Sequence, residues 1–167
     1  FKFSGCAIGT DGSPETPAAW YYDNNETLYG IDNQRKCGLL YNWYAVKFLN
    51  DNKSNLIPGW HVATNDEWID LVNAIGGATN AGTKLKASNV DWATSWGGND
   101  DFGFTIYPAG FRTDTGSFSN VGNHASFWTN DEQSSSNAYI RTFDTSAPIY
   151  LNYFQKIGGF SVRLVKD

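Results

Sequence analysis

The sequence contains no methionine, no cluster of Lys and Arg, and no apolar run that approaches the ~18 residues needed to span a bilayer. We therefore expect no membrane insertion by this segment. The N-terminus also lacks the apolar stretch of a secretory signal. Because an initiator methionine is missing, we expect the 167 residues to be a processed product or a piece of a longer protein, with targeting signals elsewhere.

Charge is also scarce. Lys and Arg number 12 against 17 Asp and Glu, a net charge of −5, so no positive surface is available for a phosphate backbone and nucleic acid is not an expected partner. Charged residues make up 17% of the chain, aromatic residues 16%, and glycine occupies 17 positions. This composition is typical of a loop-rich globular protein, and the length predicts a single domain over residues 1–167.

Cysteine occurs at two positions, Cys6 and Cys37. The pair forms either one disulfide of an exported protein or two unrelated buried thiols, and we expect the disulfide. A zinc site is not expected, because neither His61 nor His124 lies at ligand spacing from the cysteines.

Helical periodicity is confined to the first half of the chain. Apolar residues at helical spacing predict one helix from about 39 to 49. Thr64 and Glu67 have the spacing of a capping box, which predicts the start of a second helix. Its expected buried stripe consists of Trp68, Leu71, Val72 and Ile75.

After Gly77 the pattern changes to short alternating or aromatic segments separated by Gly, Asn and Asp, which is typical of short strands joined by long loops. Expected strands cover residues 102–107, 126–129, 138–143 and 160–165. In the last segment even-numbered and odd-numbered residues occupy opposite faces. Two helices followed by a set of strands predict an α+β fold with helices beside small antiparallel sheets.

Five short motifs in a fixed order resemble the Fibrobacter succinogenes major paralogous domain. They are GLLYNWYA at 38–45, GWHVAT and EW within 59–68, FGF and PAGFR within 102–112, FWT at 127–129 and GFSVRLV at 159–165. The resemblance covers about residues 37 to 167. It implies a C-type lectin-like fold, with two helices flanking small antiparallel sheets and with long loops that form a ligand face.

This chain departs from the family pattern at two positions. Ala63 stands where the family usually has proline. Leu164 stands where cysteine is frequent, so any disulfide that uses this terminal position is lost. The tryptophans at motif positions are expected in the core: Trp43, Trp60, Trp68 and Trp128.

From Ser134 onward the chain is similar to the variable region of a diversity-generating retroelement target protein. In such systems template adenines become random bases, so Asn codons turn into codons for Tyr, Ser, Asp, Phe, Ile, Thr and similar residues. The resemblance implies a variable ligand-binding region at about 127–158, in which Tyr supplies contact area as in antibody paratopes. We expect one solvent-facing patch formed by Tyr139, Ile140, Thr142, Asp144, Ser146, Tyr150, Asn152, Tyr153, Phe154 and Ile157. Packing in the core is the alternative for each of the aromatic residues.

Catalysis is not expected. The wider fold group includes a cysteine-dependent oxidase whose paired thiols lie late in the chain, and here the cysteines are Cys6 and Cys37. Neither histidine belongs to a recognisable nucleophile motif. We interpret His61 as a packed structural residue and His124 as a solvated loop residue.

Asn99, Asp100 and Asp101 have two interpretations. Their oxygens are suitable ligands for a structural Ca²⁺, which is the one cofactor we consider. An Asx-rich turn that leads into the expected strand at Phe102 is the alternative. The lectin sugar motifs Glu-Pro-Asn and Gln-Pro-Asp are absent, so calcium-dependent binding of a monosaccharide in their manner is not expected.

The expected function is ligand binding in receptor recognition or adhesion, as the variable protein of a diversity-generating retroelement. The expected partner is a protein or glycan on a cell or phage-host surface, and the expected location is extracellular, on a cell surface or a virion. One alternative is a bacterial surface carbohydrate-binding or adhesin domain without programmed diversity. Another is a structural module of an envelope or virion protein.

Overall fold

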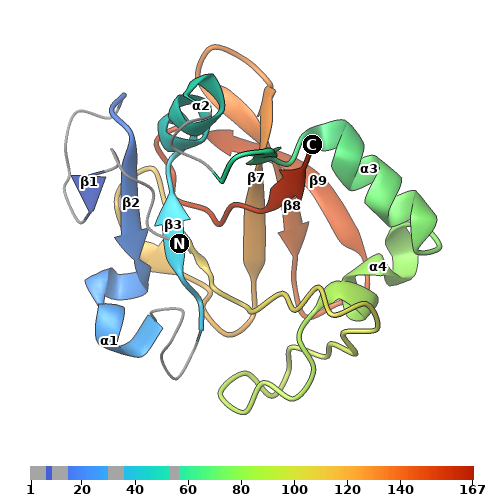
Figure 1. Ribbon diagram of the computed structural model, residues 1–167. Helices are drawn as coiled ribbons and strands as arrows, with labels where there is room; N and C mark the ends of the chain where they lie inside the picture. Colours follow the sequence, from blue (N-terminus) through green and yellow to red (C-terminus); the bar gives the residue numbers. More distant parts are fainter. Residues whose placement is uncertain (1–6, 9–14, 30–35, 53–56) are drawn as a thin grey trace.

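A computed structural model describes residues 7–8, 15–29, 36–52 and 57–167. The mixed α+β fold expected from the sequence is confirmed, with several small sheets and a few helices (Figure 1). In chain order the elements are β1 Ala7–Ile8, β2 Ala18–Tyr21, η1 Tyr22–Asn24, α1 Glu26–Tyr29, β3 Leu39–Tyr41, α2 Trp43–Asp51, β4 Trp60–Val62, α3 Asn65–Ala74, α4 Ala78–Leu85, β5 Phe111–Arg112, β6 Phe118–Ser119, β7 Ala125–Glu132, β8 Asn137–Phe143, β9 Ile149–Gln155 and β10 Leu164–Lys166.

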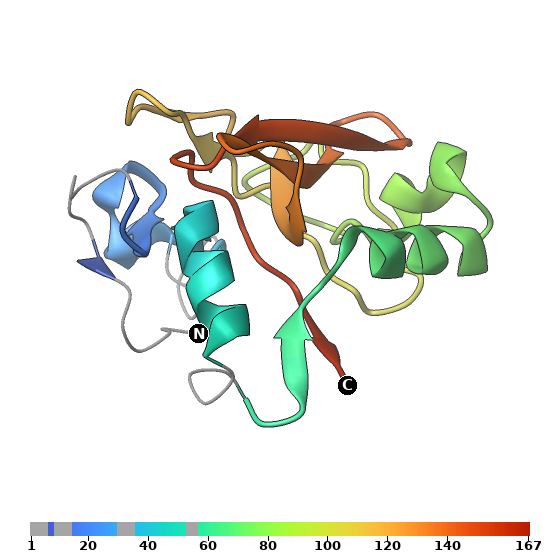
Figure 2. The same cartoon turned by 90° about the horizontal axis from the view of Figure 1, so that it is seen from above.

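The strands form four small sheets in the described part of the chain. Their orders are β1-β2-β3, β10-β4, β5-β6 and β7-β8-β9, and the described pairings are antiparallel except for β1 with β2. The sheet β7-β8-β9 lies between α2 with β1-β2-β3 at one end and α3 with α4 at the other (Figures 1 and 2). Among the described helices, none has the length and apolar character that crossing a membrane requires.

The sheet β7-β8-β9 is covered on both faces over β7 and β8. On the face toward α3 and α4, Phe127 and Phe143 pack with Trp68 and Leu85. The opposite face packs toward α2, and its cluster contains Trp43, Val46, Trp128, Ala138, Ile140 and Phe160. Alternation along each strand therefore distributes side chains to two separate cores.

Helix α3 begins where the capping box predicted. The Thr64 hydroxyl accepts from the Glu67 amide at 3.2 Å, and the Glu67 carboxylate accepts from the Thr64 amide at 2.8 Å. The expected stripe faces the core, although Leu71 is only half-buried at its rim. The tryptophan prediction is confirmed for Trp43, Trp68 and Trp128, which are buried, and is wrong for Trp60, which is half-buried.

The helix predicted from about 39 to 49 begins later, at Trp43. Residues 39–41 form β3 and pair with β2, so Leu40 is buried as a strand residue even though its spacing to Trp43 is helical. The Asn42 carboxamide then caps α2 by accepting from the Ala45 amide at 3.0 Å. Pairing with a distant strand overrides the local period here.

Helix α4 was not predicted, because its sequence ATNAGTKL has a single large apolar residue, Leu85. Tertiary packing explains the helix. A Cβ atom on Gly82 would lie 2.4 Å from the carbonyl oxygen of Ala147, so glycine allows α4 to approach the segment before β9 closely.

The strand predictions are confirmed at 126–129 and 138–143, which lie within β7 and β8. The strand predicted at 102–107 is wrong: the segment begins with a turn and a bend at 102–103 and is then irregular, with one bridge between Ile106 and Lys86. Of 160–165, only the end belongs to a strand, β10, while residues 159–161 form isolated bridges. Strand β9 was not predicted, although it carries several of the expected ligand residues.

Candidate functional site

The expected ligand residues of β8 do not face solvent. Ile140 is 5% exposed and packs in the cluster with Trp128, and Thr142 is 7% exposed with its hydroxyl 3.1 Å from that of Ser126. The prediction that Ile140 and Thr142 belong to an exposed patch is therefore wrong. The reason is topological: β8 is the middle strand of its sheet, with β7 on one edge and β9 on the other.

The prediction that Phe154 belongs to the exposed patch is also wrong, because its ring points into the core. The ring centroid lies 5.1 Å from that of Phe160 and 6.3 Å from that of Phe111. A Cβ atom on Gly158 would lie 2.7 Å from the Phe154 ring, so the turn after β9 closes tightly over it. Ile157, in that turn, is half-buried, as is Tyr139 in β8.

On strand β9, several of the expected ligand residues are exposed, as predicted. Tyr150, Leu151 and Tyr153 are 40%, 46% and 59% exposed, and Asn152 between them is also exposed. The other large hydrophobic side chains that the described structure leaves exposed are Ile69 and Phe102, on other segments. Exposed apolar surface is therefore concentrated on β9, an edge strand whose alternation directs Tyr150 to one face and Leu151 and Tyr153 to the other.

The turn between β8 and β9 carries two further expected ligand residues, Asp144 and Ser146. Asp144 is half-buried and its carboxylate accepts from the amide and the hydroxyl of Ser146. The exposed Ser146 hydroxyl lies 3.2 Å from the hydroxyl of Tyr150. Burial raises the pKa of Asp144, but the bonds from Ser146 and the charge of Lys86 outweigh it, so the carboxylate stays ionised.

Lys86 supports this turn through hydrogen bonds, a role that the sequence did not predict. The residue is 1% exposed, and its ammonium donates to the carbonyls of Asp144 and Ser146 at 2.9 and 2.8 Å. Its Nζ lies 4.9 Å from the Trp96 ring centroid. Burial lowers the pKa of Lys86, and the charge of Asp144 opposes that shift. A lone lysine between Leu85 and Ala87 carries no motif that reveals such a role.

Two other buried cations fix the strands around β9. Arg141 donates through Nη2 to the backbone and side-chain oxygens of Asn65, at 3.2 and 2.7 Å. Lys156 donates to the carbonyl of Ser135 at 2.9 Å, and its Nζ lies 4.7 Å from the Trp43 ring centroid. These bonds tie β8 to the start of α3 and the end of β9 to the β7–β8 turn.

The two histidines have different surroundings. Half-buried His61 lies between the carboxylates of Asp167 and Glu67, at 2.6 and 2.7 Å. Burial works against its charged form, but the bonds and charges of Asp167 and Glu67 outweigh it and raise the pKa of His61.

His124 lies in a loop just before β7, as expected, but the interpretation that it is solvated is wrong, because the residue is half-buried. Its ring packs edge-on against Phe111 at 5.3 Å, and its Nδ1 is buried without a hydrogen-bond partner among the described residues. Burial lowers the pKa of His124, with the charge of Asp144 opposing. The neutral imidazole is therefore the favoured form.

The segment 99–101 lies against α4 and leads into a turn at 100–103, in which the Gly103 amide donates to the carbonyl of Asp100 at 3.1 Å. The Asp100 carboxylate accepts from the amide and the hydroxyl of Thr105, both at 2.7 Å, and the amide of Asn99 donates to the carbonyl of Thr83 at 2.9 Å. This geometry is that of an Asx-rich turn. Within the described ranges, no group of three or more His, Cys, Asp and Glu side chains is arranged to hold a metal ion. Calcium binding at Asn99, Asp100 and Asp101 stays a prediction, which melting curves in excess calcium and in excess chelator test.

The disulfide prediction concerns Cys6, which lies outside the described residues, and Cys37, which is half-buried at the start of the segment leading to β3. It stays a prediction. Mass spectrometry of protein produced under oxidising conditions tests it.

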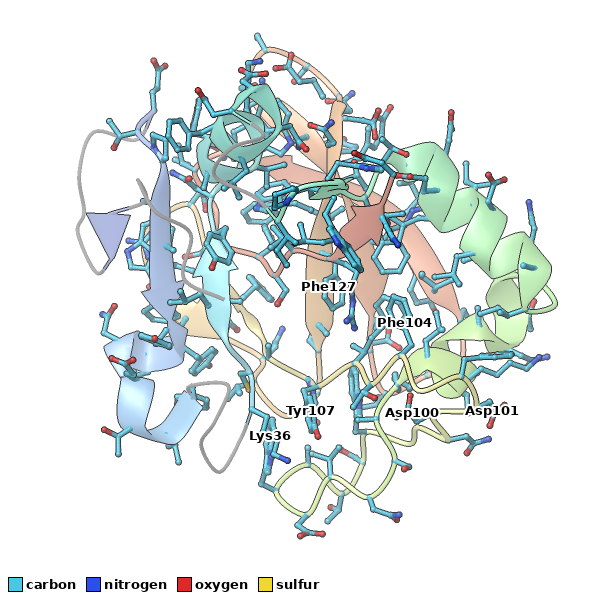
Figure 3. All side chains as sticks on the ribbon, viewed as in Figure 1. Lys36, Asp100, Asp101, Phe104, Tyr107 and Phe127 are labelled. Carbon is cyan, nitrogen blue, oxygen red and sulfur yellow. The ribbon has the colours of Figure 1, made fainter. Side chains whose placement is uncertain are left out.

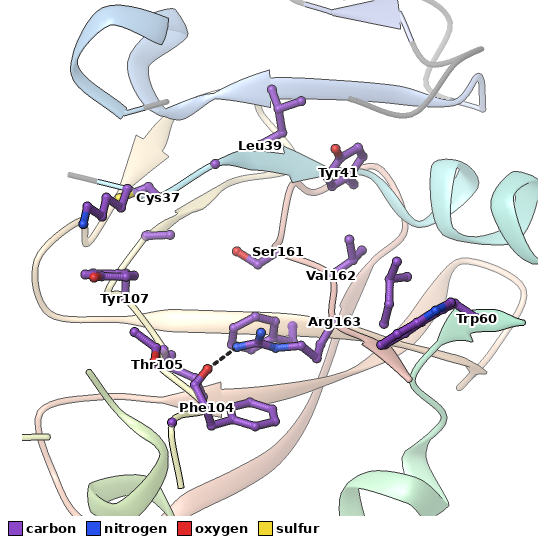
Figure 4. Close-up of a pocket in the computed structure, with 17 residues that line it drawn as sticks. Cys37, Leu39, Tyr41, Trp60, Phe104, Thr105, Tyr107, Ser161, Val162 and Arg163 are labelled. Atoms are coloured by element: carbon purple, nitrogen blue, oxygen red, sulfur yellow. Dashed lines mark hydrogen bonds between the residues drawn. The ribbon is translucent and has the colours of Figure 1, made fainter. Parts of the chain in front are cut away.

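A cavity of about 580 Å³ opens on the part of the molecule between β3 and the 103–109 loop (Figure 4). Its floor is the segment 161–164, and Arg163 crosses the middle of that floor. The Arg163 Nη2 donates to the carbonyl of Phe104 at 2.6 Å, and the guanidinium carbon lies 4.1 Å from the Phe104 ring centroid. In the described structure, none of the residues 149–155 lines this cavity. All five motif segments contribute to it, through Gly38, Trp60, Phe104, Phe127 and Arg163 among others.

Comparisons with known proteins give one match. The family model of the Fibrobacter succinogenes major domain matches residues 6–166, a longer stretch than the motifs indicated. No curated protein matches the chain, and no solved structure matches it.

Proposed function

The chain belongs to the Fibrobacter succinogenes major domain family, and from this membership together with the exposed strand β9 we propose that it is a ligand-binding domain for receptor recognition or adhesion. We further propose that the domain is not an enzyme and that it has a C-type lectin-like scaffold. The α+β architecture, with α2 and α3 beside small sheets, is consistent with that scaffold.

The observation that carries the proposal is the concentration of exposed tyrosine and leucine on β9, at Tyr150, Leu151 and Tyr153. Large side chains with few rotatable bonds supply contact area with little loss of conformational entropy. The chain is anchored on both sides of the strand, because Lys86 bonds the preceding turn and Lys156, directly after β9, bonds Ser135, so the surface is preorganised. Preorganisation favours binding because less freedom is lost when the ligand arrives.

The ligand surface proposed after correction is smaller than the sequence indicated. It comprises the exposed residues of the edge strand β9, on both of its faces, and of the preceding turn: Thr145, Ser146, Tyr150, Leu151, Asn152 and Tyr153. The proposed ligand is a protein or glycan on a cell or phage-host surface, and the proposed location is outside the cell or on a virion. The net charge of −5 disfavours nucleic acid.

We propose that this surface is diversified by a retroelement, because its residues all belong to the set reached from Asn codons by changing adenines. Burial indicates which positions can be diversified. Exposed positions such as Tyr153 tolerate replacement, whereas Ile140 in the core does not.

Sequencing the encoding locus tests the diversification. We expect a near-copy of the 3′ end of the coding region beside a reverse transcriptase gene, differing almost only where the copy has adenine. The differing codons should include those of Tyr150, Leu151 and Tyr153, and the codon of Ile140 should match the copy. A locus without such a copy contradicts programmed diversity, and the adhesin function then replaces it.

A binding measurement tests the surface itself. The double variant Tyr150→Ser, Tyr153→Ser is compared with the native chain on glycan arrays and on host-cell surfaces. Phe102→Ser is the matched control, because Phe102 is 57% exposed, close to the 59% of Tyr153, and lies on another segment. Loss of signal in the double variant alone supports the proposal. Equal loss in both variants, or no loss in either, contradicts it.

A further inference from the structure

The cavity over Arg163 forms a second site, separate from β9. We propose that it binds a small organic carboxylate attached to a ring, with the carboxylate on the Arg163 guanidinium and the ring against the aromatic side chains that line the cavity. This proposal goes beyond the recognition function of β9. It depends on different residues and has its own test.

The Arg163 guanidinium has more N–H donors than the described residues around it have acceptors for them. Nη2 donates to the carbonyl of Phe104, Nε is buried without a partner among the described residues, and Nη1 makes no hydrogen bond with any of them. Arginine has five N–H donors, so most are unused. A planar carboxylate is the group whose two oxygens match adjacent N–H donors of a guanidinium.

No described carboxylate forms an ion pair with Arg163. Asp100 is the acidic residue that acts on its charge from a distance, and both Asp100 oxygens already accept from Thr105. Burial lowers the pKa of Arg163, with Asp100 opposing, because the guanidinium is partly removed from water. A cation that is desolvated and unpaired attracts an anion more strongly than one in bulk water.

The rest of the lining is suited to a ring. Trp60, Phe104, Tyr107 and Phe127 line the cavity, and the Arg163 guanidinium carbon lies 5.9 Å from the Phe127 ring centroid as well as close to Phe104. The volume of about 580 Å³ falls within the range of ~300–1,000 Å³ found for small-molecule sites. The aromatic and aliphatic side chains around the Arg163 guanidinium favour a monocarboxylate over a polyanion.

The mouth of the cavity adds a second positive charge. Lys36 is exposed at this edge, and its side chain lies beside Tyr107 (Figure 3). Lys36 and Arg163 make this region positive on a chain whose net charge is −5. An anionic ligand is therefore drawn to this mouth rather than to the acidic remainder of the surface.

The test adds four probes, one at a time, to the full chain. Two-dimensional NMR and tryptophan fluorescence detect binding, since Trp60 lines the cavity. Phenylacetate and glucuronate present a carboxylate on an aromatic ring and on a sugar ring, and phenylacetamide and glucose are their neutral counterparts. We expect at least one carboxylate to shift the resonances of Arg163, Phe104 and Tyr107 and its neutral counterpart to leave them unchanged. The carboxylate that binds identifies the ring type. Equal shifts from acid and neutral probes, or none from any probe, overturn the proposal.

Variants locate the site. Lys36→Glu should weaken binding of the carboxylate by about threefold or more, whereas Lys47→Glu, the same charge change on the exposed face of α2, should not. Arg163→Lys should weaken it by roughly tenfold, because a lysine keeps the charge but loses the paired donors. Melting curves show whether Arg163→Lys folds, and if it does not, the Lys36→Glu and Lys47→Glu pair decides. Equal affinities in that pair contradict the site.

The two proposals fail separately. Tyr150→Ser, Tyr153→Ser should leave carboxylate binding unchanged, since β9 does not line the cavity in the described structure. A loss of carboxylate binding in this double variant contradicts a site at Arg163.

Discussion

Strands β8 and β9 pair residue for residue, from Asn137 with Gln155 to Phe143 with Ile149, yet they have opposite relations to solvent. Most of β8 is buried, whereas most of β9 is exposed. Both segments mix aromatic, aliphatic and small polar residues, and both entered the expected ligand patch on that ground. The difference shows that position in the sheet, and not composition, separates the frame from the recognition surface.

The frame around β8 depends on buried cations as well as on apolar packing. Lys86, Arg141 and Lys156 are each at most 6% exposed, and each donates to a backbone carbonyl of a neighbouring segment: the β8–β9 turn, the start of α3 and the β7–β8 turn. A buried cation is stable only where such acceptors surround it. The loops are thereby held in one arrangement, and β9 can vary its outward side chains without disturbing the pairing beneath.

The largest expected effect compares two partners across the strands. Ile140→Ala should destabilise the fold by ~2–5 kcal/mol, because it removes buried methyl groups and leaves a cavity beside Trp128. Asn152→Ala, at the paired position in β9, should change stability by less than ~0.5 kcal/mol. Urea unfolding of both variants measures the difference. Similar values for the two would abolish the distinction between frame and surface.

Replacing Lys86 tests the support of the turn that leads into β9. Lys86→Met keeps the length of the side chain but leaves the carbonyls of Asp144 and Ser146 without their donor, so we expect a loss of ~1–3 kcal/mol. Lys47→Met on the surface should have no measurable effect. Denaturant unfolding gives the loss, and faster amide exchange at 144–147 should accompany it. If the variant is as stable as the native chain, the cation does not support the turn.

The stability of the fold should depend on pH through His61 and Glu67 near the start of α3. This part of α3 contacts β8, because Asn65 accepts a hydrogen bond from Arg141. His61 has a raised pKa, so charged His61 stabilises the folded state. Its contribution to the free energy of unfolding is full below about pH 6.5 and is lost as the pH rises through the folded-state pKa. Burial works against the charge of Glu67, but bonds from Thr64 and His61 lower its pKa, so its contribution is lost as the pH falls through that lowered value.

The stability that His61 contributes should therefore fall from pH 6 to pH 8, by less than ~1 kcal/mol because these side chains are partly solvated, against an opposite slope from His124, whose pKa is lowered. His61→Gln should flatten that slope, and urea unfolding at the two pH values measures it. A slope that persists in the variant would assign the pH dependence to another group.

The smallest effect is expected on β9. Tyr153→Ser should change the free energy of unfolding by less than ~0.5 kcal/mol, because the ring is 59% exposed. Thermal and urea unfolding measure the change. A loss above ~1 kcal/mol would show that the ring packs in solution and is not available to a ligand.

Part of the fold could be predicted because its signals are local. The capping box of Thr64 and Glu67 is contained in four consecutive residues, and it correctly predicted the start of α3. Leu40 was misassigned because its spacing to Trp43 is helical while its hydrogen-bonding partner is β2, distant in the chain. Helix α4 was missed because it is stabilised by a close approach to Ala147 rather than by an apolar stripe of its own.

The sequence by itself determined the α+β class, the family, and the alternation that lets Phe160 and Val165 pack in different clusters. These properties follow from residue order alone, since periodicity and motifs are local. Only the tertiary structure decided that β8 is a middle strand and β9 an edge, that Lys86 supports a turn far along the chain, and that Arg163 lies in a cavity. Exposure is the joint result of packing by all neighbours, and the neighbours of these residues come from distant segments that no local pattern specifies.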